Sequence, residues 1–285
     1  MIDTRSMANG NAPPAGGPLL RLENLSVDFQ RHAVLRDLSL SIARGETVAI
    51  IGESGCGKTV LLKTIIGLLR PSRGQVFFEG RNLAEMNERQ LTEERIRFGF
   101  LFQNSALFDS LTVAENVGFP LRQHTTAGAE EIRRVVLSRL AEVGLPESVL
   151  GQKPAELSGG MRKRVGLARA LALEPEVMLY DEPTTGLDPI MGDVINELIL
   201  GTRRQHPVTS VLVTHDMRTA QKVADRVAML YSLTRLRPDE PQVLYDGSPK
   251  DIQDAADSRV SQFVRGEAGE RLTEMQQALA AENGD

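Results

Sequence analysis

The sequence predicts an α/β fold in which a helical segment interrupts an alternation of strands and helices. Residues 46–51 form a short apolar run that ends at a glycine-rich loop, and residues 59–69 carry leucine and isoleucine at helical spacing directly after that loop. A second apolar run, residues 177–180, ends in two acidic residues, and the alternation continues beyond it. Residues 112–172 follow a helical pattern in which no strand stands out.

Composition narrows the classes of protein that this chain can belong to. Of its 285 residues, 41% are hydrophobic and 25% are charged, which is typical of a folded globular protein. Its 33 basic and 38 acidic residues give a net charge of -5, which argues against nucleic acid as a partner. The single cysteine excludes an internal disulfide, and the amino terminus lacks the basic and apolar regions of a signal peptide. No apolar run approaches the roughly 20 residues of a membrane helix, so we expect a cytosolic protein that borrows any membrane span from a partner.

The individual elements follow from local patterns. Residues 1–18, rich in Gly, Pro, Ala and Asn, are expected to form a flexible tail. Strands are expected at residues 19–29, 38–42, 46–51, 75–80, 98–102, 177–180, 210–214 and 226–230. Helices are expected at residues 59–69, in the interrupting segment, from about Ile190 and after Met217.

A phosphate-binding loop is predicted at residues 52–59, which fit the pattern GxxxxGK[ST] between a strand and a helix. Its residues are Gly52, Glu53, Ser54, Gly55, Cys56, Gly57, Lys58 and Thr59. The glycines allow backbone NH groups to turn toward a phosphate, Lys58 can reach the β and γ oxygens of ATP, and the Thr59 hydroxyl can bind Mg²⁺. The competing interpretation is a glycine-rich turn that fits by chance, and the Cys56 thiol has no base in this motif to activate it.

The apolar run at residues 177–180 closes on Asp181 and Glu182, at a strand end of the kind where ligands collect in open α/β sheets. Asp181 is expected to hold magnesium, and Glu182 to act as general base toward the attacking water. An ordinary acidic strand terminus is the alternative, and the neighbouring phosphate loop favours the functional interpretation.

A third motif points to a family. Residues 157–161, Leu-Ser-Gly-Gly-Met, stand before a helix and the acidic strand end, and in this position they resemble the signature of ABC ATPases. Gln103, the Gly-Leu-Asp of residues 186–188 and His215 occupy the places of further family motifs. The resemblance covers about residues 19–250. It implies a RecA-like P-loop ATPase core, an antiparallel β-subdomain and a helical signature subdomain at about residues 104–172. Taken singly, each of these motifs also has a commoner explanation, such as a buried histidine or a serine that caps a helix.

The resemblance further implies that two copies face each other head to tail. Ser158, Gly159 and Gly160 of one copy would then contact the γ-phosphate of ATP held by the other. Gln103 would join the magnesium and water shell and report its state to a permease. His215 would hold the γ-phosphate, and Asp188 would link the two sites.

Two positions fit the pattern of ABC ATPases less well. Phe29 stands where the family stacks an aromatic ring on adenine, although Gln30 follows where glycine is frequent, and a core phenylalanine is a competing interpretation. Val60 stands where many relatives carry a hydroxyl group that contacts the α-phosphate, so one phosphate contact is expected to be missing.

Finer details resemble the ATPases of Mla and Mkl type: Val60, Met161, residues 102–117, residues 184–189 and residues 258–266. That subgroup implies phospholipid as cargo, an MlaE-like permease, an MCE protein (MlaD-like) and, in some systems, a STAS-domain protein (MlaB-like). The chain would then sit on the cytoplasmic face of the inner membrane. An ABC transporter for another solute remains an alternative, since cargo is not encoded in the ATPase. A non-transport ABC protein is disfavoured, because the chain has neither tandem cassettes nor a long coiled-coil insertion.

The carboxy-terminal extension, residues 251–285, is predicted to be helical. Val260, Phe263 and Val264 have helical spacing, and Ala268, Leu272, Met275 and Leu279 continue an apolar stripe. The resemblance implies that this segment docks on the neighbouring ATPase. Packing on its own core, or a frayed tail, is the alternative.

Overall fold

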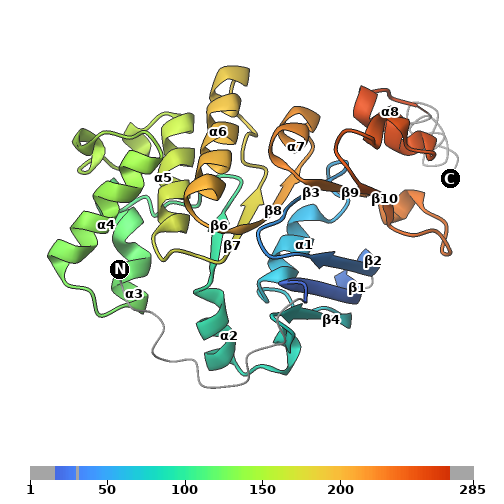
Figure 1. Ribbon diagram of the computed structural model, residues 1–285, viewed down its shortest axis with the longest axis horizontal. Coiled ribbons are helices and arrows are strands. Elements are labelled where there is room, and N and C mark those ends of the chain that lie inside the picture. The colour runs from blue at the N-terminus through green and yellow to red at the C-terminus, as the bar shows by residue number, and fades with distance from the viewer. Residues whose placement is uncertain (1–16, 30–31, 270–285) are drawn as a thin grey trace, which may run out of the picture.

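A computed structural model of the chain describes residues 17–29 and 32–269, and Figure 1 shows their arrangement. The central sheet has six strands in the order β10-β9-β3-β8-β7-β6. Five of them are parallel, and β10 runs antiparallel to β9 at one edge. The bounds are β3 Thr47–Ile51, β6 Phe98–Leu101, β7 Val177–Asp181, β8 Thr209–Thr214, β9 Arg226–Leu230 and β10 Val243–Gly247.

A second sheet is antiparallel and has the order β2-β1-β4-β5. Its strands are β1 Leu20–Phe29, β2 His32–Ile42, β4 Arg73–Phe78 and β5 Arg81–Asn82. The predicted antiparallel β-subdomain is therefore present. The tight turn between β4 and β5 places Glu79 and Gly80 at φ of 50° and 74°, the left-handed values that a two-residue hairpin turn requires.

Eight α-helices lie within the described residues. They are α1 Lys58–Ile65, α2 Glu88–Arg95, α3 Val113–His124, α4 Ala129–Glu142, α5 Gly159–Leu171, α6 Pro189–Gln205, α7 Met217–Val223 and α8 Ser258–Arg265. Short 3₁₀ turns occupy Leu83–Glu85, Glu147–Val149, Pro154–Glu156, Leu233–Arg235 and Ile252–Asp254. Every residue between β6 and β7 is described, and no strand occurs there, which agrees with the predicted helical segment. Across the described part of the chain, no helix has both the length and the apolar character needed to cross a bilayer.

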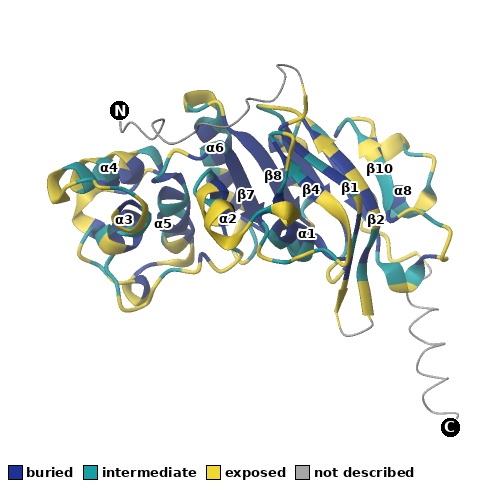
Figure 2. Ribbon diagram, turned by 90° about the horizontal axis from the view of Figure 1, so that it is seen from below, coloured by how far each residue is buried: buried dark blue, intermediate teal, exposed yellow. Residues whose placement is uncertain are grey.

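The central sheet is buried on both faces, because successive side chains of its strands enter two different cores. On β3, Val48 and Ile50 face the core shared with α1 and the antiparallel sheet, whereas Ala49 and Ile51 face the core shared with α3 to α8. Figure 2 shows the resulting band of buried strands between the two layers. This double burial explains why the central strands are continuous apolar runs in the sequence.

The segment between β6 and α3 is fixed by one buried amide. The Asn116 side chain is fully buried, and its Oδ1 accepts from the Phe108 backbone NH at 2.8 Å. Its Nδ2 donates to the carbonyls of Phe108, Leu111 and Thr112, each at 3.1 Å. Helix α3 begins just before it with a capping box formed by Thr112 and Glu115.

The first part of the carboxy-terminal extension packs on its own chain. Ile252 and Val260 are fully buried in the core that contains α5 to α7, and Phe263 and Val264 pack against the same core. Helix α8 thus packs on the core of its own chain, and docking of the extension on a neighbouring copy stays a prediction. Ala268 is exposed, and Leu272, Met275 and Leu279 lie outside the described residues.

A cluster of charged side chains joins the two sheets at one end. The Arg97 guanidinium lies 2.6 Å from the carboxylate of Glu79, 2.7 Å from Glu176 and 2.9 Å from Glu94. Its planar group also covers the Phe78 ring at 4.3 Å. Burial alone would raise the pKa of Glu79, but hydrogen bonds and charge from Arg97 and Arg44 outweigh burial and lower that pKa below its ordinary value.

We expect Glu79→Gln to lower the free energy of unfolding at pH 7 by about 1 kcal/mol, since a charge-assisted bond in a partly exposed cluster is lost. A carboxyl group with a lowered folded pKa stabilises the protein above its ordinary pKa, and that stabilisation disappears as the pH falls through the folded value. Denaturant titrations of both proteins between pH 7 and pH 3 should thus converge at acid pH. Glu93→Gln, at an exposed helix pair, serves as the control with little change. A difference of constant size across this range would contradict the assigned role of Glu79.

Candidate active site

The loop between β3 and α1 has a backbone that only glycine permits at two positions. Gly52 and Gly57 have φ of 149° and 104°. A Cβ atom on Gly52 would lie 2.2 Å from the Leu230 carbonyl oxygen, and one on Gly57 would lie 2.7 Å from a methyl group of Leu35. Both glycines let the loop pass close to neighbouring strands, so that it curls over the amino terminus of α1.

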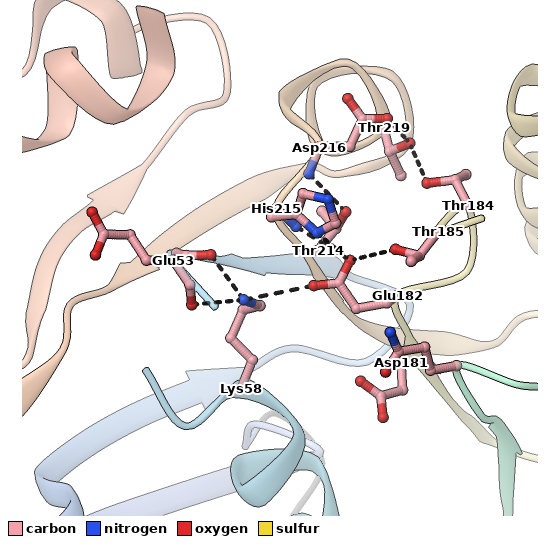
Figure 3. Close-up of polar contacts among 12 residues, drawn as sticks. Glu53, Lys58, Asp181, Glu182, Thr184, Thr185, Thr214, His215, Asp216 and Thr219 are labelled. Atoms are coloured by element: carbon pink, nitrogen blue, oxygen red, sulfur yellow. Dashed lines mark hydrogen bonds and ion pairs between the residues drawn. The ribbon is translucent and has the colours of Figure 1, made fainter. Parts of the chain in front are cut away.

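Lys58 opens α1 and points back into this loop, as Figure 3 shows. Its Nζ donates to the carbonyl oxygens of Gly52 at 2.8 Å and Glu53 at 3.0 Å, and lies 3.6 Å from Oε1 of Glu182. The ammonium is thus held by two carbonyl groups of the loop and lies close to a carboxylate. The Glu53 carboxylate belongs to a separate ion pair with Arg235, at 3.2 Å.

Thr59 and Asp181 form a pair of oxygen ligands. The Thr59 hydroxyl donates to Oδ1 of Asp181 at 2.9 Å, at the carboxyl end of β7. Burial raises the pKa of Asp181; the hydrogen bond from Thr59 opposes this, and the neighbouring charge of Glu182 adds to it. No cluster of three or more His, Cys, Asp or Glu side chains suited to a metal occurs among the described residues. Mg²⁺ is usually held by one or two carboxylates together with phosphate oxygens and water, so this hydroxyl and carboxylate fit that ion.

Glu182 follows β7 in a left-handed conformation, with φ of 47°. Its backbone NH donates to the Val213 carbonyl on β8 at 3.0 Å. Its Oε2 lies 2.8 Å from Nδ1 of His215 and accepts from the Thr185 hydroxyl at 3.1 Å (Figure 3). A non-glycine residue with positive φ is strained, so these contacts hold Glu182 in a conformation that it would not adopt freely.

Lys163, on α5, is a site residue that the sequence analysis missed. Only 4% of it is exposed, and its Nζ donates to the carbonyl of Glu182 at 3.1 Å and to the carbonyl of Gln103. Burial lowers its pKa to about 8, although the charges of Asp181 and Glu182 oppose that shift. A signal was available, because Lys163 shares the apolar face of α5 with Gly160, three residues before it, and with the buried Leu167, four residues after it.

The remaining predicted residues lie at helix starts and on the surface. Ser158 caps α5 by accepting from the Met161 NH at 3.2 Å, and Asp188 caps α6 by accepting from Ile190 and Met191, each at 3.0 Å. The side chains of Ser158, Gln103 and Asp188 are exposed. The starts of α5 and α6 are adjacent, since a Cβ on Gly160 would lie 2.7 Å from the Met191 methyl group. Gly159 is exposed beside them.

Phe29, at the end of β1, is 43% exposed, so it is not the core phenylalanine of the competing interpretation. Gln30 lies outside the described residues. Val60 is partly buried against the core around α1 and offers no hydroxyl group. Cys56 is buried, and burial raises the pKa of its thiol, which agrees with an inert side chain.

The structure gathers the phosphate loop, Asp181, Glu182 and His215 at one edge of the central sheet. The signature motif is elsewhere: Figures 1 and 2 both show α5 in the lobe with α3 and α4, while α1 lies between the two sheets. Within one chain, the helix that follows the signature motif and the helix that follows the phosphate loop thus belong to different parts of the fold.

Comparison with known proteins places the chain in a family. A family model described as ABC transporter matches residues 35–185. The Intermembrane phospholipid transport system ATP-binding protein MlaF of Haemophilus influenzae is 38% identical over 250 residues, which are 88% of this chain and 91% of the relative. The "Probable ribonucleotide transport ATP-binding protein mkl" of Mycobacterium tuberculosis is 42% identical over 215 residues, 75% of this chain, and the match spans only 60% of that longer relative.

A solved structure agrees in fold. A dimeric ATP-binding cassette in a post-hydrolysis state, bound to ADP and phosphate, superposes with a TM-score of 0.72 at 31% identity, covering 81% of this chain and 98% of its own. With a family model that covers more than half of the sequence and a relative matched over nearly its whole length, the chain belongs to the ABC transporter family.

Proposed function

We propose that this chain energises phospholipid transport, as the ATPase of a transporter whose membrane-spanning permease is a separate MlaE-like protein. The observation that carries the catalytic part is the contact set at the sheet edge, where Lys58, Thr59, Asp181, Glu182 and His215 converge.

The loop residues bind the nucleotide. As ATP enters, the Lys58 ammonium exchanges the carbonyls of Gly52 and Glu53 for β- and γ-phosphate oxygens, and the loop NH groups and the α1 dipole add positive potential. Thr59 and Asp181 would hold Mg²⁺, with help from the Gln103 side chain. Magnesium, when bound, neutralises phosphate charge. Exposed Phe29 stacks on adenine, and Val60 adds only apolar contact beside the loop.

Glu182 acts on the water. Its carboxylate is aimed by His215 and Thr185, and in this position it accepts the proton of the water that attacks the γ-phosphate. The His215 side chain is 53% exposed, so a bound γ-phosphate could reach it beside Glu182. We assign His215 the role of holding that phosphate.

A second copy completes the site. Ser158, Gly159 and Gly160 of that copy bring the amino terminus of the 13-residue helix α5 to the γ-phosphate. Ile190 is 77% exposed next to Asp188, at the start of α6 and beside the start of α5. We propose that Asp188 and Ile190 meet the partner copy when the dimer closes.

The cargo is inferred from relatives. The MlaF relative is named for intermembrane phospholipid transport and matches this chain over most of both proteins, whereas the mycobacterial relative is named for ribonucleotides and is matched over 60% of its length. Phospholipid is therefore the preferred cargo, with an MCE protein, and in some systems a STAS-domain protein, as further partners. The chain would lie on the cytoplasmic face of the inner membrane. A ribonucleotide or another small solute is the second candidate.

We expect Glu182→Gln to retain ATP binding and to lose hydrolysis by about 10²- to 10⁴-fold, because the amide has nearly the same size but cannot accept a proton. ATP affinity and steady-state phosphate release of the purified transporter measure the two effects. Turnover near that of the unmodified protein would remove Glu182 from the role of general base.

Composite sites predict complementation between two inactive variants. Lys58→Ala removes the phosphate contact, while Ser158→Asp keeps a good helix cap and places a negative charge at the γ-phosphate. Each homodimer should be inactive, and a purified heterodimer should regain one working site, measured as phosphate release. A heterodimer as inactive as both parents would contradict sites assembled from two chains.

Partners and cargo are tested by purifying the tagged chain from membranes and identifying the proteins that accompany it. We expect a permease and an MCE protein, and phospholipid transfer between vesicles that depends on ATP and is lost with Glu182→Gln. A complex without an MCE protein whose ATPase responds to ribonucleotides instead would favour the second candidate.

A further inference from the structure

Lys163 is a buried cation at the joint between the helical lobe and the catalytic edge of the sheet. It lies on the inner face of α5, which packs along β6, and it donates to two carbonyl groups. One belongs to Gln103, two residues after β6, and the other belongs to Glu182, directly after β7. A single ammonium thus connects three segments of the site.

Burying a lysine at this place costs free energy unless its ammonium group is hydrogen-bonded. Burying an ammonium requires hydrogen-bond partners, and an apolar residue would fill the same face of α5 without that requirement. The packing around it is tight, since a Cβ on Gly166, three residues further along α5, would lie 3.1 Å from both Leu101 and Ser105. Helix, strand end and following loop are therefore fixed closely around the ammonium.

The bond to Glu182 acts on a strained residue. Glu182 is held in its left-handed conformation by bonds on both sides of its backbone: its NH donates to the Val213 carbonyl, and its own carbonyl accepts from Lys163 at 3.1 Å and from the Thr185 NH at 3.3 Å. Without the bond from Lys163, only the longer bond from the Thr185 NH holds this carbonyl, and the backbone at Glu182 is freer to leave the left-handed region. Leaving that region changes φ of Glu182, which turns its Cβ and moves the carboxylate away from His215 and Lys58.

We propose that Lys163 is a positioning residue, which ties the Gln103 segment to the Glu182 backbone and so makes the aim of the Glu182 carboxylate depend on the position of the helical lobe. This inference rests on the proposed role of Glu182 as general base. The segment that contains Gln103 connects β6 to α3, and Asn116 of α3 fixes it by hydrogen bonds. A displacement of the helical lobe therefore acts on Lys163 in two ways, through α5 and through this connecting segment.

The test uses the full chain in the assembled transporter, with Lys163→Met, Lys163→Gln and Lys163→Arg. Arg164→Met is the matched control, because Arg164 is the next cation of the same helix and also donates to a carbonyl, that of Gly144 at 2.9 Å, within the helical lobe. At saturating ATP we expect Lys163→Met to lower kcat by about 10- to 100-fold, the cost of a misplaced catalytic group. The dissociation constant of ATP should stay within about twofold of the unmodified value, since the loop contacts are untouched.

Rescue and non-additivity separate positioning from a merely structural role. Lys163→Gln can donate to one carbonyl and Lys163→Arg to both, so kcat should rise from Met to Gln to Arg. Added to Glu182→Gln, Lys163→Met should lower kcat little further, because the carboxylate that it positions is already gone. If Glu182→Gln alone retains turnover, the general-base assignment fails, whatever Lys163 does.

Several outcomes would overturn the proposal. A kcat of Lys163→Met equal to that of Arg164→Met would show that the bridge has no catalytic effect. If Lys163→Met, Lys163→Gln and Lys163→Arg lose the same amount of kcat, Lys163 contributes only to the stability of the fold. The same conclusion follows if Lys163→Met lowers kcat as strongly in the Glu182→Gln protein as in the unmodified one. If Lys163→Met does not fold, the ratio of kcat between Lys163→Gln and Lys163→Arg decides, and equal values count against the proposal.

Discussion

Charged groups at the carboxyl edge of the central sheet are buried because they satisfy one another. Lys58 is 7% exposed, Asp181 4% and Glu182 8%, and each would be expensive to bury alone. Two loop carbonyls and a carboxylate surround the ammonium, a hydroxyl faces Asp181, and an imidazole faces Glu182. In the proposed function, ATP binding is an exchange of partners, in which phosphate oxygens replace the carbonyls around Lys58. The site is preorganised for an anion, and that order is what the surrounding sheet and helices maintain.

Burial of the central sheet on both faces is the condition for this arrangement. Strands β3, β7 and β8 are covered by a core on each side, so polar groups gather only where the strands end. The same condition made these strands and their terminal residues predictable, since they are apolar runs followed by glycine, by two carboxylates or by histidine. The parallel register between β7 and β8 then places Asp181 opposite Val213, which brings Glu182 and His215 together.

Features that depend on contacts distant in sequence were harder to predict. Strand β10 is only partly buried and follows a polar loop, so its pattern is weak. Helix α2 is largely polar, and its capping box of Asn87 and Gln90 was its main signal. Lys163 is one of three consecutive basic residues after the signature motif, and its helical spacing from Gly160 and Leu167 is the one sequence feature that separates it from Arg162 and Arg164. The burial of Val260 in the chain's own core depends on contacts with helices far away in sequence, so the pattern of residues 258–266 alone could not identify what that side chain packs against.

The helical lobe meets the catalytic edge through directional polar bonds as well as apolar packing. Lys163 donates to the Gln103 carbonyl, and Arg169, on the same helix, donates to the carbonyls of Ser105 and Ala106, each at 2.7 Å. Asn116 fixes the same segment from α3. Each of these bonds contributes only about 1 to 3 kcal/mol net, and a carbonyl released from one can bind water or a neighbouring donor. Hydrogen bonds of this kind fix the helical lobe in one position relative to the sheet. The lobe can still move to another position without exposing a large apolar surface. Because the loop between β6 and α3 carries both the carbonyl bound by Lys163 and the side chain of Gln103, movement of the lobe and geometry of the site are linked through a few hydrogen bonds.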